Sequence, residues 1–129
     1  MIFDSNIVFA LLDEVAGSPV FELLECQRAG HRVFINEIIF AEISPRFLDA
    51  GLVTEVCEVF GFEIETLTLA ECHLAGQAFA EYRRRGGERR SILPDFLIGA
   101  QAETERLSLL TRDVRRYRTY FPSIELIAP

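Results

Sequence analysis

The chain begins Met1-Ile2-Phe3-Asp4-Ser5-Asn6, and this stretch decides which fold the rest of the sequence fits. A short apolar run that ends in polar residues is typical of a buried strand, and we expect the carboxyl end of this strand to open into a loop. In open α/β sheets, functional groups gather at the carboxyl ends of strands. Asp4 is therefore the first candidate for a functional acid.

Beyond this opening, strand and helix signals alternate along the chain. Helices between successive strands imply right-handed crossovers, so we expect one domain over residues 1–129. Its predicted architecture is a three-layer α/β/α fold with a mostly parallel central sheet. A short turn-rich stretch is expected after Asp113. The predicted strands cover residues 1–3, 33–35, 63–67, 107–110 and 124–127, and the predicted helices cover residues 18–30, 37–43, 53–60, 68–82 and 94–102.

Composition fits one compact domain and narrows the class of protein. Half of the 129 residues are hydrophobic, which is enough for a substantial core. No apolar run is long enough to span a bilayer, and the N-terminus lacks the pattern of a signal peptide. The three cysteines show no Cys-x-x-Cys spacing, which favours reduced thiols. We therefore expect a cytoplasmic protein with no membrane partner.

The charge is divided unevenly along the chain. Residues 1–82 carry 3 arginines against 14 acids, and residues 83–129 carry 10 arginines against 6 acids. The chain contains no lysine at all. This absence excludes P-loop nucleotide binding. It also counts against haloacid-dehalogenase-like phosphatases and response-regulator receivers, which start with a similar acid-tipped strand but rely on a lysine near the phosphoryl group.

Four acids lie at places that can converge on one edge of such a sheet. Asp4 and Asp113 follow short apolar runs, Asp95 lies in the first turn of a predicted helix, and Glu42 lies in the short helix after the second strand. Carboxylates gathered at one point repel each other unless a cation is present, and such a site suits Mg²⁺ or Mn²⁺. Each acid also has an ordinary structural interpretation, as a loop, helix-start, turn or solvated residue. The residues alone leave both interpretations open.

Four segments form an ordered set over nearly the whole chain, namely Asp4-Ser5-Asn6, residues 36–42, residues 93–102 and residues 109–113. In this order they resemble the motifs of the PIN domain family. The third has the family's Asp-x-x-Ile-x-Ala pattern, starting at Asp95. The size of the chain is most similar to the VapC-type toxin branch of toxin–antitoxin pairs.

This resemblance implies a Mg²⁺- or Mn²⁺-dependent endoribonuclease that an antitoxin restrains and that forms a homodimer. The family motifs assign the metal to four carboxylates, those of Asp4, Glu42, Asp95 and Asp113. They assign the orientation of carboxylates or waters to three further residues, namely Ser5, Asn6 and Thr111.

Glu37 competes with Glu42 for the role of the second acid. The two residues are five positions apart on a predicted helix, so they point in different directions and only one should face the site. The family pattern favours Glu42.

Arginines cluster just before Asp95 and around Asp113, and they could bind the phosphates of an RNA backbone. A solvated helix end, or salt bridges to the acid-rich first half, explains them equally well. The net charge of −7 is unusual for a nucleic-acid binder, although a local basic patch would reconcile it. The candidates for RNA contact are Arg83, Arg84, Arg85, Arg89, Arg90 and Arg112.

The alternative function is a catalytically silent PIN-like module that binds a protein. The Phe- and Val-rich helices could bury an antitoxin segment or a second copy of the chain. Because all four motif acids are intact, the sequence favours the enzyme. A metal phosphatase is a third alternative, which the missing lysine weakens.

Overall fold

In the computed structural model, which describes residues 1–129, five short strands form one sheet in the order β3-β2-β1-β4-β5. All four strand pairs are parallel, which confirms the predicted sheet. The central strand β1 places Ile2 opposite Phe34 of β2 and Leu109 of β4. The strands are β1 (Ile2–Phe3), β2 (Phe34–Ile35), β3 (Glu63–Ile64), β4 (Leu109–Leu110) and β5 (Leu126–Ile127).

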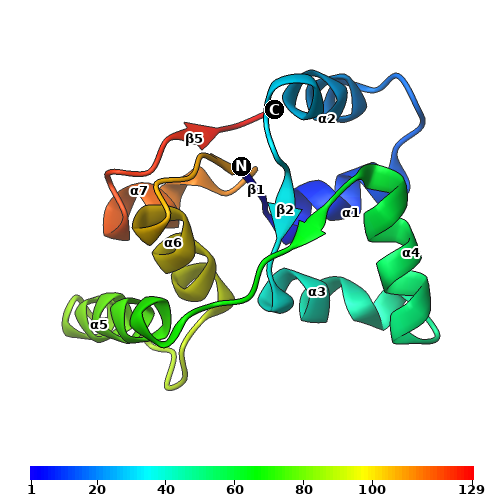
Figure 1. Cartoon of the computed structure of the whole chain (residues 1–129). Helices are drawn as coiled ribbons and strands as arrows, with labels where there is room; N and C mark the ends of the chain where they lie inside the picture. Colours follow the sequence, from blue (N-terminus) through cyan, green and yellow to red (C-terminus); the bar gives the residue numbers. More distant parts are fainter.

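Seven α-helices cover the sheet and complete the predicted three layers. Figure 1 shows α1 to α4 on one side of the strands and α5 to α7 on the other. None of these helices is both long and apolar enough to cross a membrane. The helices are α1 (Ser5–Asp13), α2 (Pro19–Gly30), α3 (Glu37–Ile43), α4 (Ala50–Phe60), α5 (Leu69–Arg84), α6 (Pro94–Thr104) and α7 (Val114–Tyr120), with a 3₁₀ turn at Ser44–Arg46.

Capping residues begin and end several helices where the sequence predicts. The side chain of Asn36 accepts hydrogen bonds from two backbone N–H groups in the first turn of α3. Thr68 and Glu71 form a reciprocal capping box at the start of α5. Gly61 ends α4 with a φ of 75°, a conformation that glycine adopts without strain.

The structure differs from the sequence-based prediction after β1 and after β4. Helix α1 begins at Ser5, where a loop is predicted, because the Asp4 side chain accepts a hydrogen bond from the Ser5 N–H and caps the helix. Helix α7 covers residues 114–120, where a turn-rich stretch is predicted. Its β-branched and aromatic residues have low helix propensity, and the burial of Tyr117, which is 0% exposed, outweighs that preference.

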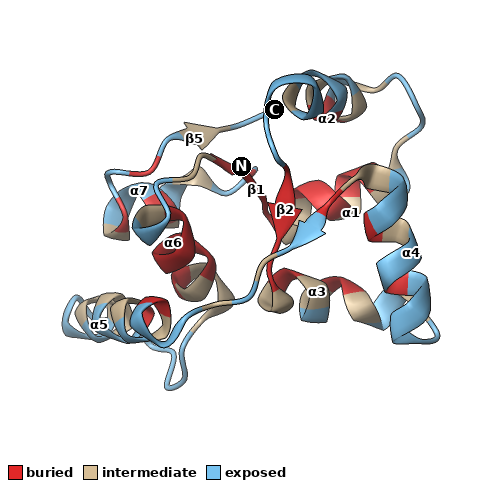
Figure 2. Cartoon of the chain, in the orientation of Figure 1, coloured by how far each residue is buried: buried red, intermediate tan, exposed pale blue.

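The core surrounds the central strands and α6. Figure 2 shows buried residues along β1, β2 and α6, whereas α2 and α5 are largely exposed. Helix α6 packs closely against the segment after α7, because Gly99 has no side chain and the Phe121 ring occupies the space where one would lie. A Cβ atom at Gly99 would lie 2.4 Å from the ring of Phe121.

The strand order reverses between β1 and β4, which are neighbours in the sheet although most of the chain separates them. Such a reversal opens a crevice at the carboxyl ends of the two strands, where ligands of α/β proteins bind. Asp4 follows β1 directly and Thr111 follows β4 directly. The topology therefore brings the first motif, which contains Asp4, next to the last motif, which contains Thr111.

Candidate active site

Asp4 lies at the carboxyl end of β1 and is only 3% exposed. Its Oδ1 accepts a hydrogen bond from the backbone N–H of Ser5 at 2.8 Å. Its Oδ2 accepts from Asn6 Nδ2 at 3.0 Å, from the Thr111 hydroxyl at 2.7 Å and from the Tyr117 hydroxyl at 3.3 Å. Four donors from three parts of the chain thus fix the orientation of one buried carboxylate.

Burial also changes the acidity of this group and of its neighbours. Burial raises the pKa of Asp4, the hydrogen bond from Thr111 opposes the rise, and the negative charge of Asp95 adds to it. Burial likewise raises the pKa of Glu42, and the charges of Asp4 and Asp95 raise it further. The pKa of Tyr117 lies well above its usual value through burial and the nearby carboxylate charges. Asp4, Glu42 and Asp95 therefore act on one another, as carboxylates at a shared site do.

The two competing glutamates of α3 have different surroundings. Both carboxylate oxygens of Glu37 accept hydrogen bonds from the backbone N–H of Leu67, at 2.9 and 3.1 Å. Glu37 therefore ties α3 to the segment after β3. In contrast, Glu42 Oε2 is buried and has no hydrogen-bond partner. An unpartnered buried oxygen is costly, and a cation or a donor brought by a ligand would relieve that cost.

Asp95 lies in the first turn of α6 and forms an ion pair with Arg116 of α7. The Asp95 side chain is 23% exposed and that of Arg116 is 35% exposed, so the pair is partly shielded from solvent. The guanidinium group brings a positive charge to one oxygen of Asp95. It also links the carboxylate site to α7.

Thr111 lies at the centre of a small network at the end of β4. Its hydroxyl donates to Asp4 and accepts hydrogen bonds from Asn6 Nδ2 at 3.2 Å and from the backbone N–H of Asp113 at 3.0 Å. The backbone N–H of Arg112 donates to Asn6 Oδ1 at 3.0 Å. Asp113 itself is exposed, at the rim of this network. Asn6 and Thr111 thus hold the segment that carries Asp113 against β1.

A buried amide pair joins the helices that carry Glu42 and Asp95. Asn36, which caps α3, donates from Nδ2 to Gln101 Oε1 of α6 at 2.9 Å. Gln101 Nε2 in turn donates to the backbone carbonyl of Glu65 at 3.2 Å. The pair positions α3 relative to α6, and thereby positions one acid relative to the other.

The donor atoms suit a hard divalent cation such as Mg²⁺. They are carboxylate oxygens, and one of them, Glu42 Oε2, is buried without a partner; the charges of Asp4 and Asp95 raise the pKa of Glu42. As the side chains stand, no three His, Cys, Asp or Glu groups are gathered closely enough to hold a metal ion alone. Mg²⁺ commonly takes one or two carboxylates and completes its coordination with waters and substrate phosphates, so this donor set fits a partly hydrated ion.

Comparison with known proteins assigns the chain to a family. A family model of the PIN domain matches residues 1–122. The chain belongs to the PIN domain family. A comparison with curated proteins finds no match.

Solved structures share the fold of this PIN domain over nearly its whole length. VapBC2 from Rickettsia felis, bound to a DNA fragment from its promoter, is 18% identical, with a TM-score of 0.78 over 100% of this chain and 99% of that chain. DNA-bound VapBC from Salmonella typhimurium is 20% identical, with a TM-score of 0.73 over 98% and 96%. FitAcB from Neisseria gonorrhoeae is 17% identical, with a TM-score of 0.72 over 98% and 95%. At these identities the likeness is one of fold.

Sequence reasoning missed two residues of the candidate site, Tyr117 and Arg116, because it missed α7. A signal was present: Val114, Tyr117 and Phe121 follow a spacing of i, i+3 and i+7, and Asp113 stands at the capping position. The seven-residue length of the helix made that signal weak.

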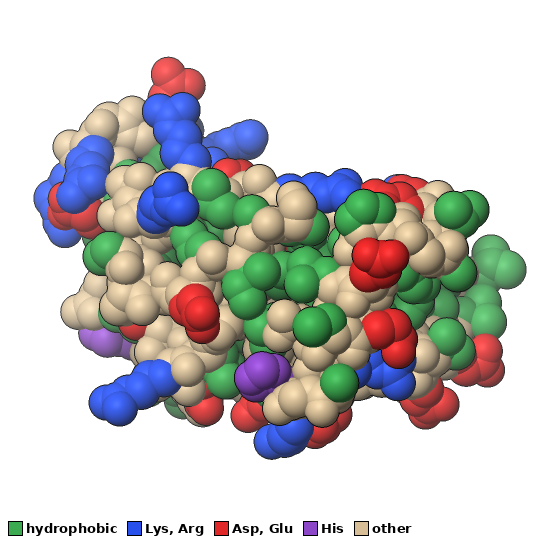
Figure 3. Space-filling view, turned by 90° about the horizontal axis from the view of Figure 1, so that it is seen from above, with side chains coloured by type: hydrophobic (Ala, Val, Ile, Leu, Met, Phe, Trp, Pro, Cys, Tyr) green, Lys and Arg blue, Asp and Glu red, His purple; other side chains and the backbone are tan.

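The arginines predicted to contact RNA divide into two groups. Arg84 and Arg85 both form ion pairs with Glu81, and Arg112 forms one with Glu14. The other three are exposed and form no ion pair, namely Arg83, Arg89 and Arg90. Figure 3 shows arginine side chains gathered at its left end, the end where Figure 1 draws α5, α6 and α7.

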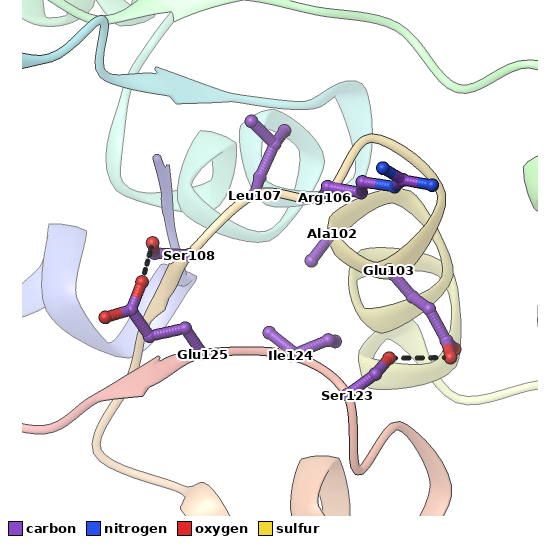
Figure 4. Close-up of a pocket in the computed structure, with 8 residues that line it drawn as sticks. All are labelled: Ala102, Glu103, Arg106, Leu107, Ser108, Ser123, Ile124 and Glu125. Carbon is purple, nitrogen blue, oxygen red and sulfur yellow. Dashed lines mark hydrogen bonds between the residues drawn. The ribbon is translucent and has the colours of Figure 1, made fainter.

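The surface of the PIN domain has two pockets of similar size. One, of about 370 Å³, lies at the amino ends of β4 and β5, away from Asp4. Figure 4 shows that its two acids are engaged by serines: Ser108 donates to Glu125 at 2.6 Å, and Ser123 donates to Glu103 at 2.9 Å. The other, of about 360 Å³, is lined by residues of α5 and α7, and its lining includes Asp113 and Arg116, which pairs with Asp95.

Proposed function

We propose that this PIN domain is a Mg²⁺- or Mn²⁺-dependent endoribonuclease of the VapC toxin type that acts in the cytoplasm. The observation that supports the proposal is the electrostatic interaction of Asp4, Glu42 and Asp95 near the switch point of the sheet, where burial and the neighbouring carboxylate charges raise the pKa of Asp4 and Glu42. An array of this kind needs a cation, and a cation beside a cleft suits the hydrolysis of phosphodiesters.

Each residue has a defined task in the proposed reaction. Asp4, Glu42 and Asp95 hold the metal ion, directly or through water, and Asp113 at the rim completes the set when substrate is bound. When bound, the ion supplies charge that offsets the negative charge developing on the phosphate and that activates the attacking water. Thr111, together with Ser5 and Asn6, orients the Asp4 carboxylate, as its hydrogen bonds indicate.

The proposal includes an antitoxin as partner. Structures with this fold include a toxin–antitoxin complex from Klebsiella pneumoniae, at 20% identity and with a TM-score of 0.71. This chain exposes large apolar side chains on and before α4, including Leu48 at 97% and Val59 at 74% exposure, which a partner could cover. The homodimer stays a prediction, which light scattering of the purified chain tests.

The test is cleavage of a mixed pool of transfer, ribosomal and messenger RNA by the purified full-length chain in Mg²⁺, Mn²⁺ or EDTA. Asp95→Asn is the informative variant, because Asp4 is tied to the fold by four hydrogen bonds. Asp13→Asn, an exposed acid at the end of α1, is the matched control.

Discrete products that disappear in EDTA and in Asp95→Asn, but persist in Asp13→Asn, would support the nuclease. No cleavage by folded, metal-loaded, partner-free protein would overturn it in favour of the protein-binding module.

A further inference from the structure

We propose that the pocket between α5 and α7 is the subsite for one nucleotide of the single-stranded nucleic acid that the carboxylates cleave. The base lies against two tyrosine rings, and the phosphate lies on two arginines. This inference rests on the proposed nuclease function and adds to it the residues that hold the substrate. The pocket, called here the α5–α7 pocket, is lined by Tyr82, Asp113, Arg115, Arg116, Thr119 and Tyr120.

The position of the pocket is the first argument. Arg116 lines it and pairs with Asp95, so the pocket wall continues directly into the carboxylate site. Asp113, the acid at the rim of that site, is part of the same lining. A nucleotide seated here would have its phosphate next to the proposed metal ligands. The volume of about 360 Å³ lies in the range of sites for small ligands.

The aromatic walls are the second argument. The Tyr82 and Tyr120 rings have centroids 6.2 Å apart and pack edge-on against the buried ring of Phe96, at 5.5 and 5.2 Å. Tyr82 is further held by the backbone of Gly87, where an added Cβ would lie 2.3 Å from the ring. The rings are therefore already in place, so stacking a base on them costs little ordering entropy.

The charge of the lining is the third argument. Arg115 is exposed and forms no ion pair, while the guanidinium of Arg85 lies 5.4 Å from the centroid of the Tyr120 ring. The lining contains one acid, Asp113, and two arginines, Arg115 and Arg116. The pocket at the other end of the sheet has the reverse balance, with two glutamates and one arginine. Arginines beside aromatic rings suit a ligand that carries both a phosphate and a base.

The experiment measures binding separately from cleavage. The full-length chain is titrated into a labelled single-stranded RNA in EDTA, at several salt concentrations, and fluorescence anisotropy gives the affinity. DNA of the same sequence is the second probe. Arg115→Gln removes a charge from the pocket and Thr119→Phe fills it. Arg118→Gln, an exposed arginine on the same helix that does not line the pocket, is the matched control.

We expect Arg115→Gln to weaken binding several-fold and to reduce the slope of log affinity against log salt by about 0.7, the value for one lost phosphate contact on a single strand. Thr119→Phe should weaken binding roughly tenfold, because it displaces a stacked base. Arg118→Gln should match the wild type on both probes.

The outcomes separate this inference from the nuclease proposal. If the wild type cleaves RNA but Arg115→Gln and Thr119→Phe bind like Arg118→Gln, the subsite is overturned and the nuclease stands. If no RNA is cleaved but these variants still lose affinity for either probe, the subsite stands and the nuclease fails. If the wild type binds neither probe, the subsite is overturned.

Discussion

The hydroxyl of Tyr117 donates a hydrogen bond of 3.3 Å to the buried carboxylate of Asp4, so the last helix of the chain stabilises the end of its first strand. Tyr117 is 0% exposed, and its hydrogen bond lowers the pKa of Asp4 against the effect of burial. The burial of Tyr117, together with this contact, favours α7 despite its weak helix signal. It also makes Tyr117 a positioning residue for the proposed site.

Tyr117→Phe should lower the free energy of unfolding by about 1 kcal/mol, because one buried acceptor loses a donor while three remain. The pKa of Asp4 should rise further, which weakens metal binding below neutral pH. Urea unfolding and Mn²⁺ titration measure the two effects. Tyr120→Phe, whose hydroxyl makes no hydrogen bond within the chain, is the control for stability. Equal unfolding free energies for the two variants would contradict the role given to Tyr117.

The two glutamates of α3 predict stability changes of opposite sign. Glu42→Gln removes a charge that other carboxylates repel, so the metal-free protein should gain stability, by about 0.5 kcal/mol after allowance for its partial exposure. Glu37→Gln weakens the contact with Leu67 N–H and removes an acid from the first turn of α3, so it should cost about 1 kcal/mol. Thermal unfolding in EDTA compares them. A loss of stability in Glu42→Gln would refute the strain assigned to this carboxylate.

The pH dependence follows from the same carboxylates. The pKa values of Asp4 and Glu42 are raised in the folded protein above their ordinary values of 3.8 and 4.5. At pH values between the ordinary and the raised pKa of each group, unfolding therefore releases protons. The contribution of these groups to stability falls as the pH rises through that interval. The stability gain of Glu42→Gln should be present at neutral pH and should fade as the pH falls below the ordinary value of 4.5, where Glu42 becomes protonated in both states. A gain that persists at pH 3 would mean that charge is not its cause.

Helical glycines provide a test of the packing that holds the site. Gly99→Ala places a methyl group 2.4 Å from the buried ring of Phe121, and should cost about 2 kcal/mol because neither side can yield. Gly76→Ala on α5, where nothing lies within 4 Å, should instead stabilise by about 0.5–1 kcal/mol. Denaturant unfolding of both variants measures the contrast. Equal effects would show that α6 moves freely against the segment after α7.

The sequence predicts the fold well because its local and global signals agree. The predicted strand before Asp4 and the predicted helix starts near residues 37 and 68 are boundaries that the structure confirms, and Asn36 and Thr68 cap the two helices. The carboxylates at strand ends follow from the parallel topology. The interactions within the site do not, because the Arg116–Asp95 pair and the Tyr117–Asp4 hydrogen bond depend on how α7 packs. No spacing rule connects residues that meet only after the sheet has assembled.

The ion pair of Arg116 with Asp95 predicts competition between this arginine and a metal ion. The guanidinium occupies one Asp95 oxygen and repels a second cation, so Arg116→Gln should bind Mn²⁺ several-fold more tightly than the wild type. The same variant should bind single-stranded RNA more weakly, because the α5–α7 pocket loses a charge. Calorimetric titration with Mn²⁺ and anisotropy with RNA measure these opposite changes.

Arg46→Gln, which removes an exposed ion pair with Asp13 at the far end of α1, is the control for both titrations. It should leave the Mn²⁺ and RNA affinities unchanged, because its charge is remote from Asp95. If Arg116→Gln bound Mn²⁺ no more tightly than this control, the guanidinium of Arg116 would not compete with the metal ion. Its contact with Asp95 would then serve only to anchor α7 on α6.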